Sequence, residues 1–232
     1  MNFRILILFV LFFLGVNAQE NKFSKPNYKR INKLTSKKKS DLYFPKLMKR
    51  YLESDCYMTL EEKRFLYYGF VFRKNYKPYT ASKYRPVINK LLRKPKLSKI
   101  DLKELLRQTD LHLYHHPFDV EILRVRVYVY KQLRDKINIA KSRNQIKIIK
   151  DVLMSSGNGK TKNTAFHVIN IKHEYELLKM LGYQQLGRRK SINKFEYLKI
   201  KPNKDHIGGL YFNLIQSAKS LNNKIKSKSG KI

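Results

Sequence analysis

Residues 156–178 have the sequence SGNGKTKNTAFHVINIKHEYELL, and the spacing of apolar residues changes within this stretch. Before it, apolar residues recur every three or four positions, as on one face of a helix. Within it, AFHVINI at residues 165–171 is a short run of β-branched and aromatic residues, which is typical of a strand. Two similar runs follow, FEYLKI at residues 195–200 and GLYFNL at residues 209–214. Helices followed by a small sheet, which we expect to be antiparallel, predict an α+β fold.

The Gly-Asn-Gly-Lys-Thr at residues 157–161 is similar to part of a phosphate-binding loop, but its context excludes that function. Such a loop needs a further glycine five positions before Gly159, where Met154 stands. It also follows a strand and begins a helix, whereas here a helix precedes the loop and a strand follows it. Gly157 and Gly159 instead predict a tight connection that uses positive φ angles.

Residues 42–155 are predicted to form antiparallel helical hairpins, loosely like tetratricopeptide repeats but without a strict repeat. Thr59 and Glu62 form a capping box, because each side chain can accept a hydrogen bond from the other's backbone amide. In the helix that follows, Gly69 allows a neighbouring backbone to come close. The aromatic residues that share one face of this helix are predicted to be core: Phe65, Tyr68 and Phe72.

Three further helices are predicted from their boundaries and apolar stripes. One begins near Ser98, and its buried stripe comprises Leu102, Leu105, Leu106, Thr109 and Leu113. Asp119 caps the next, and a third helix covers residues 137–155.

Residues 156–215 are predicted to be a small β-rich region, packed on the helices, with one inserted helix. That helix runs from residue 173 to residue 181 and ends at Gly182, which suits the left-handed conformation after a helix. Residues 201–205 form a turn that joins the last two strands.

The first 18 residues have the three parts of a secretory signal peptide. Arg4 is positively charged, residues 5–16 are an apolar run, and small residues precede a cleavage site between Ala18 and Gln19. The apolar run is shorter than the ~20 residues that span a bilayer. We therefore expect residues 1–18 to be removed, leaving a periplasmic or extracellular protein without a transmembrane segment.

The charge of the chain is strongly unbalanced, with 51 Lys and Arg against 17 Asp and Glu, or +34. Inside a cell this balance indicates nucleic-acid binding, but nucleic acid is not an expected partner of an exported protein. Anionic envelope polymers and lipid head groups are the expected partners, and compositional drift is the alternative explanation of the charge. Residues 19–41 are predicted to be a basic flexible arm and residues 216–232 a basic tail. The candidate anion contacts are two basic clusters: Lys37, Lys38, Lys39 and Arg188, Arg189, Lys190.

No catalytic, cofactor-binding or metal-binding residue is predicted. His112, His115 and His116 have a spacing that zinc ligands can use, but Pro117 ends the helix and no third ligand is near in sequence. Cys56, the one cysteine, is predicted to be a half-buried structural residue.

Several motifs together resemble one known family. YYGFVF at residues 67–72, YKPY at residues 76–79, the stretch quoted first and GGLYFNL at residues 208–214 are similar to the exported bacterial family catalogued as domain of unknown function forty-nine nineteen. The family's glycine loop, Ala-Phe/Tyr-x-Val-Ile strand and Glu-Tyr pair correspond here to Gly157-Asn158-Gly159, residues 165–169 and Glu174-Tyr175. The resemblance covers roughly residues 42–214, and it implies export and helices before strands, but no activity. Members often show Cys-Asp where this chain has Asn193-Lys194, which argues against a catalytic thiol there.

Two functions follow from these observations. The first is a non-catalytic, envelope-associated binding protein that contacts anionic material. The alternative is an exported, hydrolase-like enzyme whose site is assembled around His167, Glu174 and Tyr175.

Overall fold

The computed structural model of this chain describes residues 23–214. The predicted signal peptide, its cleavage site at Ala18 and Gln19, and the basic tail of residues 216–232 lie outside the described residues. Within residues 23–214, no helix has both the length and the apolar character needed to cross a membrane.

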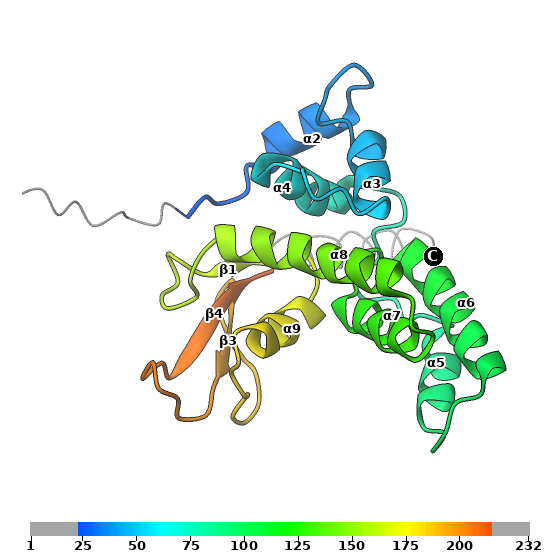
Figure 1. Cartoon of the computed structure of the whole chain (residues 1–232). Coiled ribbons are helices and arrows are strands. Elements are labelled where there is room, and N and C mark those ends of the chain that lie inside the picture. Colours follow the sequence, from blue (N-terminus) through cyan, green and yellow to red (C-terminus); the bar gives the residue numbers. More distant parts are fainter. Residues whose placement is uncertain (1–22, 215–232) are drawn as a thin grey trace, which may run out of the picture.

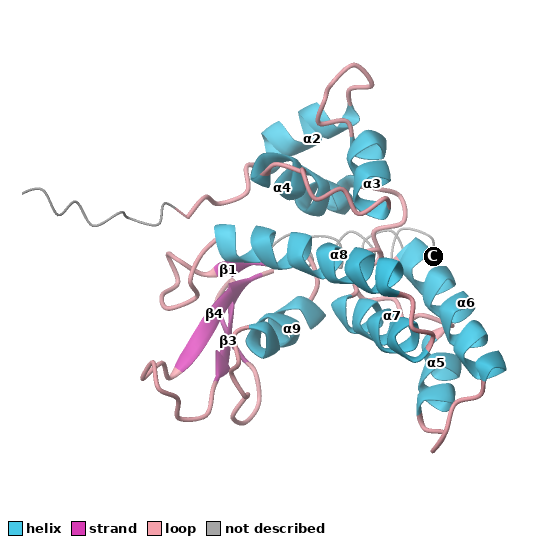
Figure 2. Cartoon of the chain, viewed as in Figure 1, coloured by secondary structure: helices cyan, strands magenta, loops and turns pink. Residues whose placement is uncertain are grey.

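Helices form most of the described chain, and the strands come near its end (Figure 2). The helical elements are α2 (Tyr28–Ser36), α3 (Phe44–Leu52), α4 (Leu60–Gly69), the short 3-10 helix η1 (Phe70–Phe72), α5 (Arg85–Leu92), α6 (Lys99–His115), α7 (Val120–Gln132), α8 (Lys136–Ser155) and α9 (Lys172–Met180). The strands are β1 (Phe166–His167), β2 (Lys190–Ile192), β3 (Phe195–Lys199) and β4 (Gly209–Asn213). The predicted α+β fold is therefore confirmed.

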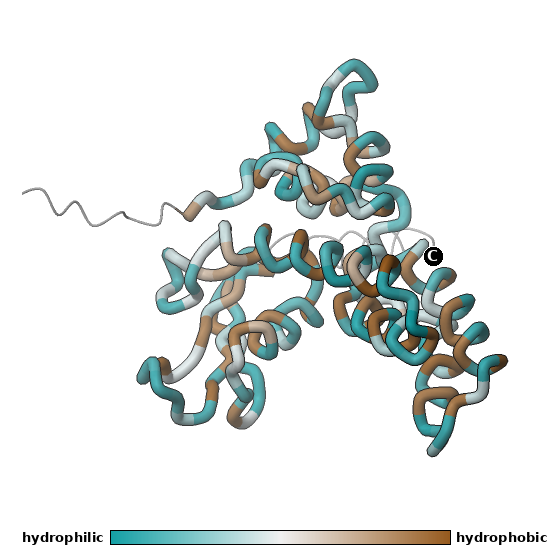
Figure 3. Tube along the Cα trace, in the orientation of Figure 1, coloured by the Kyte–Doolittle hydropathy of each residue, from teal (hydrophilic) through white to brown (hydrophobic). Residues whose placement is uncertain are grey.

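Helix α8 runs through the middle of the molecule (Figure 1). The group of α2, α3 and α4 lies on one side of it, and α7, α9 and the sheet lie on the other (Figure 1). Along the helices, hydrophobic and hydrophilic residues alternate in short blocks (Figure 3), as expected when one face of each helix is buried. One apolar core joins α4, α8, α9 and the sheet, and a smaller one joins α5, α6 and α7.

Side-chain caps begin α4, α6 and α7, at the two caps predicted from the sequence and at Ser98, near which a helix start was predicted. Thr59 and Glu62 make both bonds of a capping box, and Ser98 and Asp101 make a second one. Asp119 accepts from the Ile122 amide at the start of α7. The aromatic stripe of α4 is core as predicted, since Phe65 and Tyr68 are buried and Phe72 packs against the same cluster.

Helix α2 corrects the expectation of a flexible arm over residues 19–41. Its buried residues, Ile31 and Thr35, face α4 and are separated by four positions, which is one helical turn. A Cβ atom at Gly69 would lie 3.0 Å from Thr35 Cγ2, so this glycine lets α2 approach α4 closely. Arg30 also forms an ion pair with Glu61 at 2.8 Å. Burial of a narrow apolar stripe outweighs the high charge of this segment, and the fold begins before residue 42.

The sheet is mixed, which corrects the expectation of a purely antiparallel one. Its strand order is β1-β4-β3-β2, with β2–β3 and β3–β4 antiparallel but β1 parallel to β4. The direction of β1 is fixed by the chain on either side, because it comes from α8 and continues into α9. Turn residues 201–205 join β3 to β4 as predicted.

The glycine loop after α8 makes the tight connection that was predicted. Gly159 has a φ of +70° as predicted, whereas Gly157 does not have a positive φ, so the prediction was wrong on that point. At Gly157 a Cβ atom would lie 2.2 Å from the carbonyl oxygen of Thr164, so only glycine fits there. The Gly159 carbonyl accepts from the amide of Tyr211 at 2.7 Å, which attaches the loop to β4. Helix α9 ends as predicted at Gly182, with a φ of +77°.

Candidate functional site

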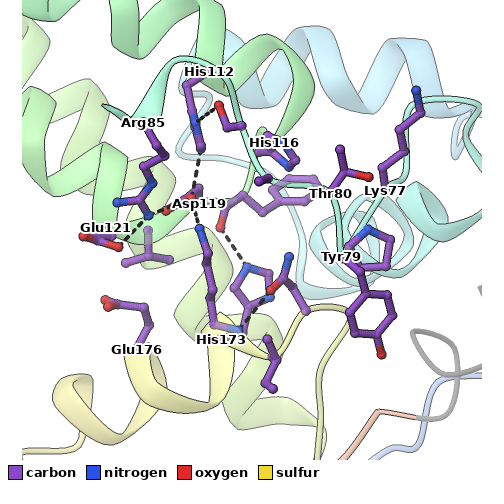
Figure 4. Close-up of a pocket in the computed structure, with 18 of the residues that line it drawn as sticks. Lys77, Tyr79, Thr80, Arg85, His112, His116, Asp119, Glu121, His173 and Glu176 are labelled. Atoms are coloured by element: carbon purple, nitrogen blue, oxygen red, sulfur yellow. Dashed lines mark hydrogen bonds and ion pairs between the residues drawn. The ribbon is translucent and has the colours of Figure 1, made fainter. Parts of the chain in front are cut away.

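A cavity of about 780 Å³ lies where five segments of the chain meet. Its wall is formed by the loop of residues 76–86, the helix α5, the end of α6, the start of α7, and residues 169–173 with Glu176 at the start of α9. Aromatic residues, histidines and charged residues all contribute side chains. Figure 4 shows His112, His116 and Asp119 close together, with Arg85 and Glu121 on one side of Asp119 and Lys77 and Tyr79 on the other.

His112 is the centre of a chain of hydrogen bonds in this wall. It is 1% exposed and lies in the last turns of α6. Its Nε2 is 2.9 Å from Asp119 Oδ2, and its Nδ1 is 2.9 Å from Ser82 Oγ. An ionised carboxylate can only accept, so Asp119 places the imidazole proton on Nε2. In the neutral imidazole, Nδ1 is then the acceptor for the hydroxyl proton of Ser82.

Asp119 is ionised in this setting. Burial raises the pKa of its carboxyl, but the hydrogen bond from His112 and the charges of Lys172 and Arg85 outweigh burial and hold the pKa well below its usual range. The Lys172 Nζ and Arg85 guanidinium lie 3.3 Å and 3.2 Å from Asp119 Oδ2. The same carboxylate caps α7 through its other oxygen. Asp119 thus has a fixed charge and a fixed position.

Two further histidines of the wall are neutral at pH 7. Burial lowers the pKa of His116 to about 4, with a smaller effect from the nearby His112, whose ring centre is 5.0 Å away. Burial also lowers the pKa of His173 to about 4. His173 Nε2 donates to the Phe118 carbonyl at 2.9 Å, and its Nδ1 accepts from the Tyr67 hydroxyl at 2.6 Å. Both nitrogens of His173 are therefore used to join α4, the loop before α7, and α9.

The charged residues of the wall are of two kinds. The carboxylates are all ion-paired: Asp119 as described, Glu121 with Arg85 at 2.5 Å, and Glu176 with Lys179 at 2.9 Å. In contrast, Lys77, Lys90 and Arg93 line the cavity without an ion-pair partner in the described part of the chain. The cavity therefore has an excess of positive charge that no protein carboxylate neutralises.

The structure separates the histidines of the predicted cluster. His112 and His116 lie side by side at the cavity, whereas the ring of His115 stacks on Tyr84 with a centroid distance of 6.2 Å. Across residues 23–214 there is no group of three or more His, Cys, Asp or Glu residues placed to hold a metal ion.

The residues of the alternative enzyme hypothesis do not line the cavity. His167 is half-buried in β1, and burial lowers its pKa to about 4. Glu174 is fully buried and faces Arg189 and Glu196, while Tyr175 packs against the main core. The prediction that Cys56 is half-buried was wrong, because this cysteine is exposed in the turns between α3 and α4.

The two basic clusters predicted from the sequence lie away from the cavity wall. Lys37, Lys38 and Lys39 are exposed in the turn after α2. Arg188 is exposed beside β2, and Lys190 begins that strand. Arg189 is partly used within the protein, since it lies 3.5 Å from Glu196 and 3.9 Å from Glu174.

Sequence reasoning missed Ser82 and the pairing of His112 with Asp119. The pairing left one signal, because Asp119 follows His112 by seven residues, just beyond the helix end at Pro117. A chain that reverses there can bring a helix cap back against the preceding helix. Ser82, 30 residues before His112, gave no such signal.

The motifs at residues 157–159, 165–169 and 174–175 all lie in the segment that carries the chain from α8 through β1 into α9. The family model described as Domain of unknown function (DUF4919) matches residues 29–224. The chain belongs to the DUF4919 family. The match begins within α2, so the DUF4919 domain includes the helix that was predicted to be an arm. Neither a search of curated proteins nor a search of solved structures found a match.

Proposed function

We propose that this DUF4919 protein is an exported binding protein that holds an anionic ligand in the cavity between α5, α6, α7 and α9. The observation that supports this most is a set of wall cations that have no ion-pair partner within residues 23–214: Lys77, Lys90 and Arg93. Unneutralised cations in a concave surface concentrate the potential there and attract anions. The N-terminal residues support export, which would bring the cavity into contact with envelope material.

The other wall residues favour an acidic oligosaccharide over a simple ion. Tyr79 lines the cavity and is 43% exposed, so its ring is available to pack on a ligand. Asn89 and Asn170 add amide groups that can bind hydroxyls. Apolar and aromatic side chains also line the cavity and give a ligand a surface on which to pack. Carboxylates on a sugar chain would then meet Lys77, Lys90 and Arg93.

The test is calorimetric titration of the protein with an oligogalacturonate, a sugar chain that carries carboxylates. The variant Lys77→Gln/Lys90→Gln/Arg93→Gln removes three charges from the cavity, and Lys37→Gln/Lys38→Gln/Lys39→Gln removes three charges from outside it. We expect the cavity variant to lose affinity roughly tenfold or more and the control to change far less. Affinity should also fall as NaCl is raised, because salt screens the contacts.

A second arm replaces the sugar with phosphatidylglycerol vesicles, since lipid head groups are the other source of anionic groups. Binding of vesicles but not of the sugar would contradict the proposed ligand class. Equal losses in the two triple variants would contradict the cavity as the site and would favour dispersed surface charge.

A further inference from the structure

Ser82, His112 and Asp119 have the arrangement of a nucleophile, a general base and an orienting carboxylate. Both hydrogen bonds measure 2.9 Å, and the acceptor nitrogen of the imidazole faces the serine hydroxyl. A serine hydroxyl becomes a useful nucleophile when an adjacent base can take its proton and a third group holds that base. Here Nδ1 faces the serine and Nε2 faces the carboxylate. The roles of general base and orienting carboxylate depend on the positions of the three groups, and either ring nitrogen of the histidine can face the serine.

His173 provides an internal comparison, because it is equally buried but purely structural. Its partners are a backbone carbonyl and the hydroxyl of Tyr67, which also accepts from the Ile169 amide. His112 is instead placed between an ionised carboxylate and a small hydroxyl. A histidine that only joins segments of the chain does not need either of these partners.

Ser82 is also positioned where a substrate could reach it. It is half-buried and lines both the main cavity and an adjoining hollow of about 240 Å³. His116 lines both spaces as well. A group bonded to Ser82 would therefore have open space on two sides, one for the acyl group and one for the leaving alcohol.

We propose that Ser82 is the nucleophile of an esterase activity, and that the substrate is a carboxylic ester carried by the anionic ligand of the cavity. The anionic part of this substrate rests on the proposed function, whereas the role of Ser82 rests on its bond to His112. Cleavage of such an ester leaves the charged part of the ligand at the cations Lys77, Lys90 and Arg93.

The reaction balances without any oxidant or further reactant except water. Ser82 Oγ forms a bond to the ester carbonyl carbon while its proton moves to His112 Nδ1. The bond from that carbon to the alcohol oxygen then breaks, and the alcohol leaves with the proton from Nδ1. Water next attacks the acyl-serine and gives a proton to Nδ1. The bond to Oγ breaks, the carboxylic acid leaves, and the proton returns to Ser82 Oγ.

The direct test is covalent labelling of the protein with a fluorophosphonate, which a nucleophilic serine attacks with release of fluoride. We expect the intact mass to rise by one adduct, and peptide fragmentation to place it on Ser82. Ser82→Ala should abolish the adduct. Ser191→Ala, which removes an exposed hydroxyl bonded to Glu196 at 2.7 Å, should label like the original protein. Absence of the adduct, or its location on another residue, would overturn the inference.

Turnover of 4-nitrophenyl acetate gives an independent readout. We expect nitrophenolate release to be lost in Ser82→Ala and lowered roughly 100-fold or more in Asp119→Asn, which leaves His112 without its orienting charge. Asp119 also caps α7, so circular dichroism must show that Asp119→Asn is folded. If it is not, Ser82→Ala and the mapped adduct decide the question. Release that persists in Ser82→Ala would overturn the role of Ser82.

The two proposals can fail separately. Oligogalacturonate binding is measured on the original, unlabelled protein, and labelling of Ser82 is measured without the sugar, so neither result depends on the other. Sugar binding without labelling would overturn only the esterase inference. Labelling of Ser82 without sugar binding would overturn the proposed function and the anionic part of the substrate, and would leave the role of Ser82 as nucleophile.

Discussion

Glu174 is the buried side chain whose environment is least favourable for its charge. The residue is 0% exposed, and neither carboxylate oxygen has a hydrogen-bond partner within residues 23–214. Burial raises the pKa of this carboxyl to about 8; Arg189 opposes the shift, and Glu196 adds to it. The opposing effect is limited because Arg189 lies 3.9 Å away and closer to Glu196, at 3.5 Å. Glu174 is therefore protonated at pH 7 in the folded protein.

This protonation predicts that the protein loses stability as the pH rises from 6.5 to 8. The folded state retains the Glu174 proton up to about pH 8, whereas the unfolded chain releases it near the ordinary pKa of 4.5. The unfolded state thus binds fewer protons in this range, and the free energy of unfolding falls by up to about 1.4 kcal/mol per pH unit. Glu174→Gln should remove the slope in urea unfolding curves, whereas Glu53→Gln, at an exposed site, should not.

Below pH 6.5 the buried histidines act in the opposite direction. The pKa values of His116, His167 and His173 are lowered to about 4, so the unfolded chain binds more protons between pH 4 and 6.5. Stability should rise with pH through that window. The original protein and Glu174→Gln should therefore be compared above pH 6.5. If the free energy of unfolding of Glu174→Gln fell with pH as steeply as that of the original protein, Glu174 would not be protonated at pH 7.

At the scale of elements, the glycine loop sets the position of the sheet on the helices. It turns the chain from α8 into β1 and also bonds to β4. The space at Gly157 is closed by backbone atoms, which cannot move aside as a flexible side chain can. This part of the fold therefore depends on the absence of a single Cβ atom.

Gly157→Ala should destabilise the protein by roughly 3 kcal/mol or more, because the new Cβ would lie 2.2 Å from the Thr164 carbonyl oxygen. Gly208→Ala is the matched control, since its Cβ would lie 3.7 Å from Tyr197 Oη, an ordinary contact. Urea unfolding of both variants measures the difference. Similar losses in the free energy of unfolding for the two variants would show that the loop relaxes around the added methyl group.

The sequence predicted those elements whose signals are local. The capping residues Thr59, Ser98 and Asp119 and the apolar stripes located α4, α6 and α7. Helix α2 was missed because only Ile31 and Thr35 are buried in a highly charged segment. The direction of β1 was missed because its partner β4 is 46 residues away, as Phe166 pairs with Phe212. The hydrogen bonds that connect Ser82, His112 and Asp119 were missed for the same reason, because Ser82 is 30 residues from His112 in the sequence.

At the scale of the whole molecule, positive charge exceeds what the acids can neutralise. The 51 Lys and Arg residues face only 17 Asp and Glu residues, so most cations have no acid to pair with. Repulsion among like charges disfavours the compact state. Salt screens this repulsion, and it also screens the attraction between the cavity and an anionic ligand.

The protein should therefore become more stable as NaCl is raised from about 20 to about 300 mM, while its ligand binding weakens. The urea midpoint measures the first effect and calorimetry the second. Lys37→Glu/Lys38→Glu/Lys39→Glu lowers the net charge by six and should reduce the gain in stability. A midpoint that falls with salt would show that the ion pairs outweigh the repulsion.

Strand β4 lies between β1 and β3, although it follows both in the chain. A ribosome therefore makes both outer partners before the strand that joins them. Until residues 209–213 emerge, the nascent chain carries two strand edges with unpaired backbone groups, which can pair with other chains. A premature stop codon just before Gly209 would make that condition permanent. Such a product would retain every helix that the structure describes within residues 23–214 and still be a substrate for quality-control proteases.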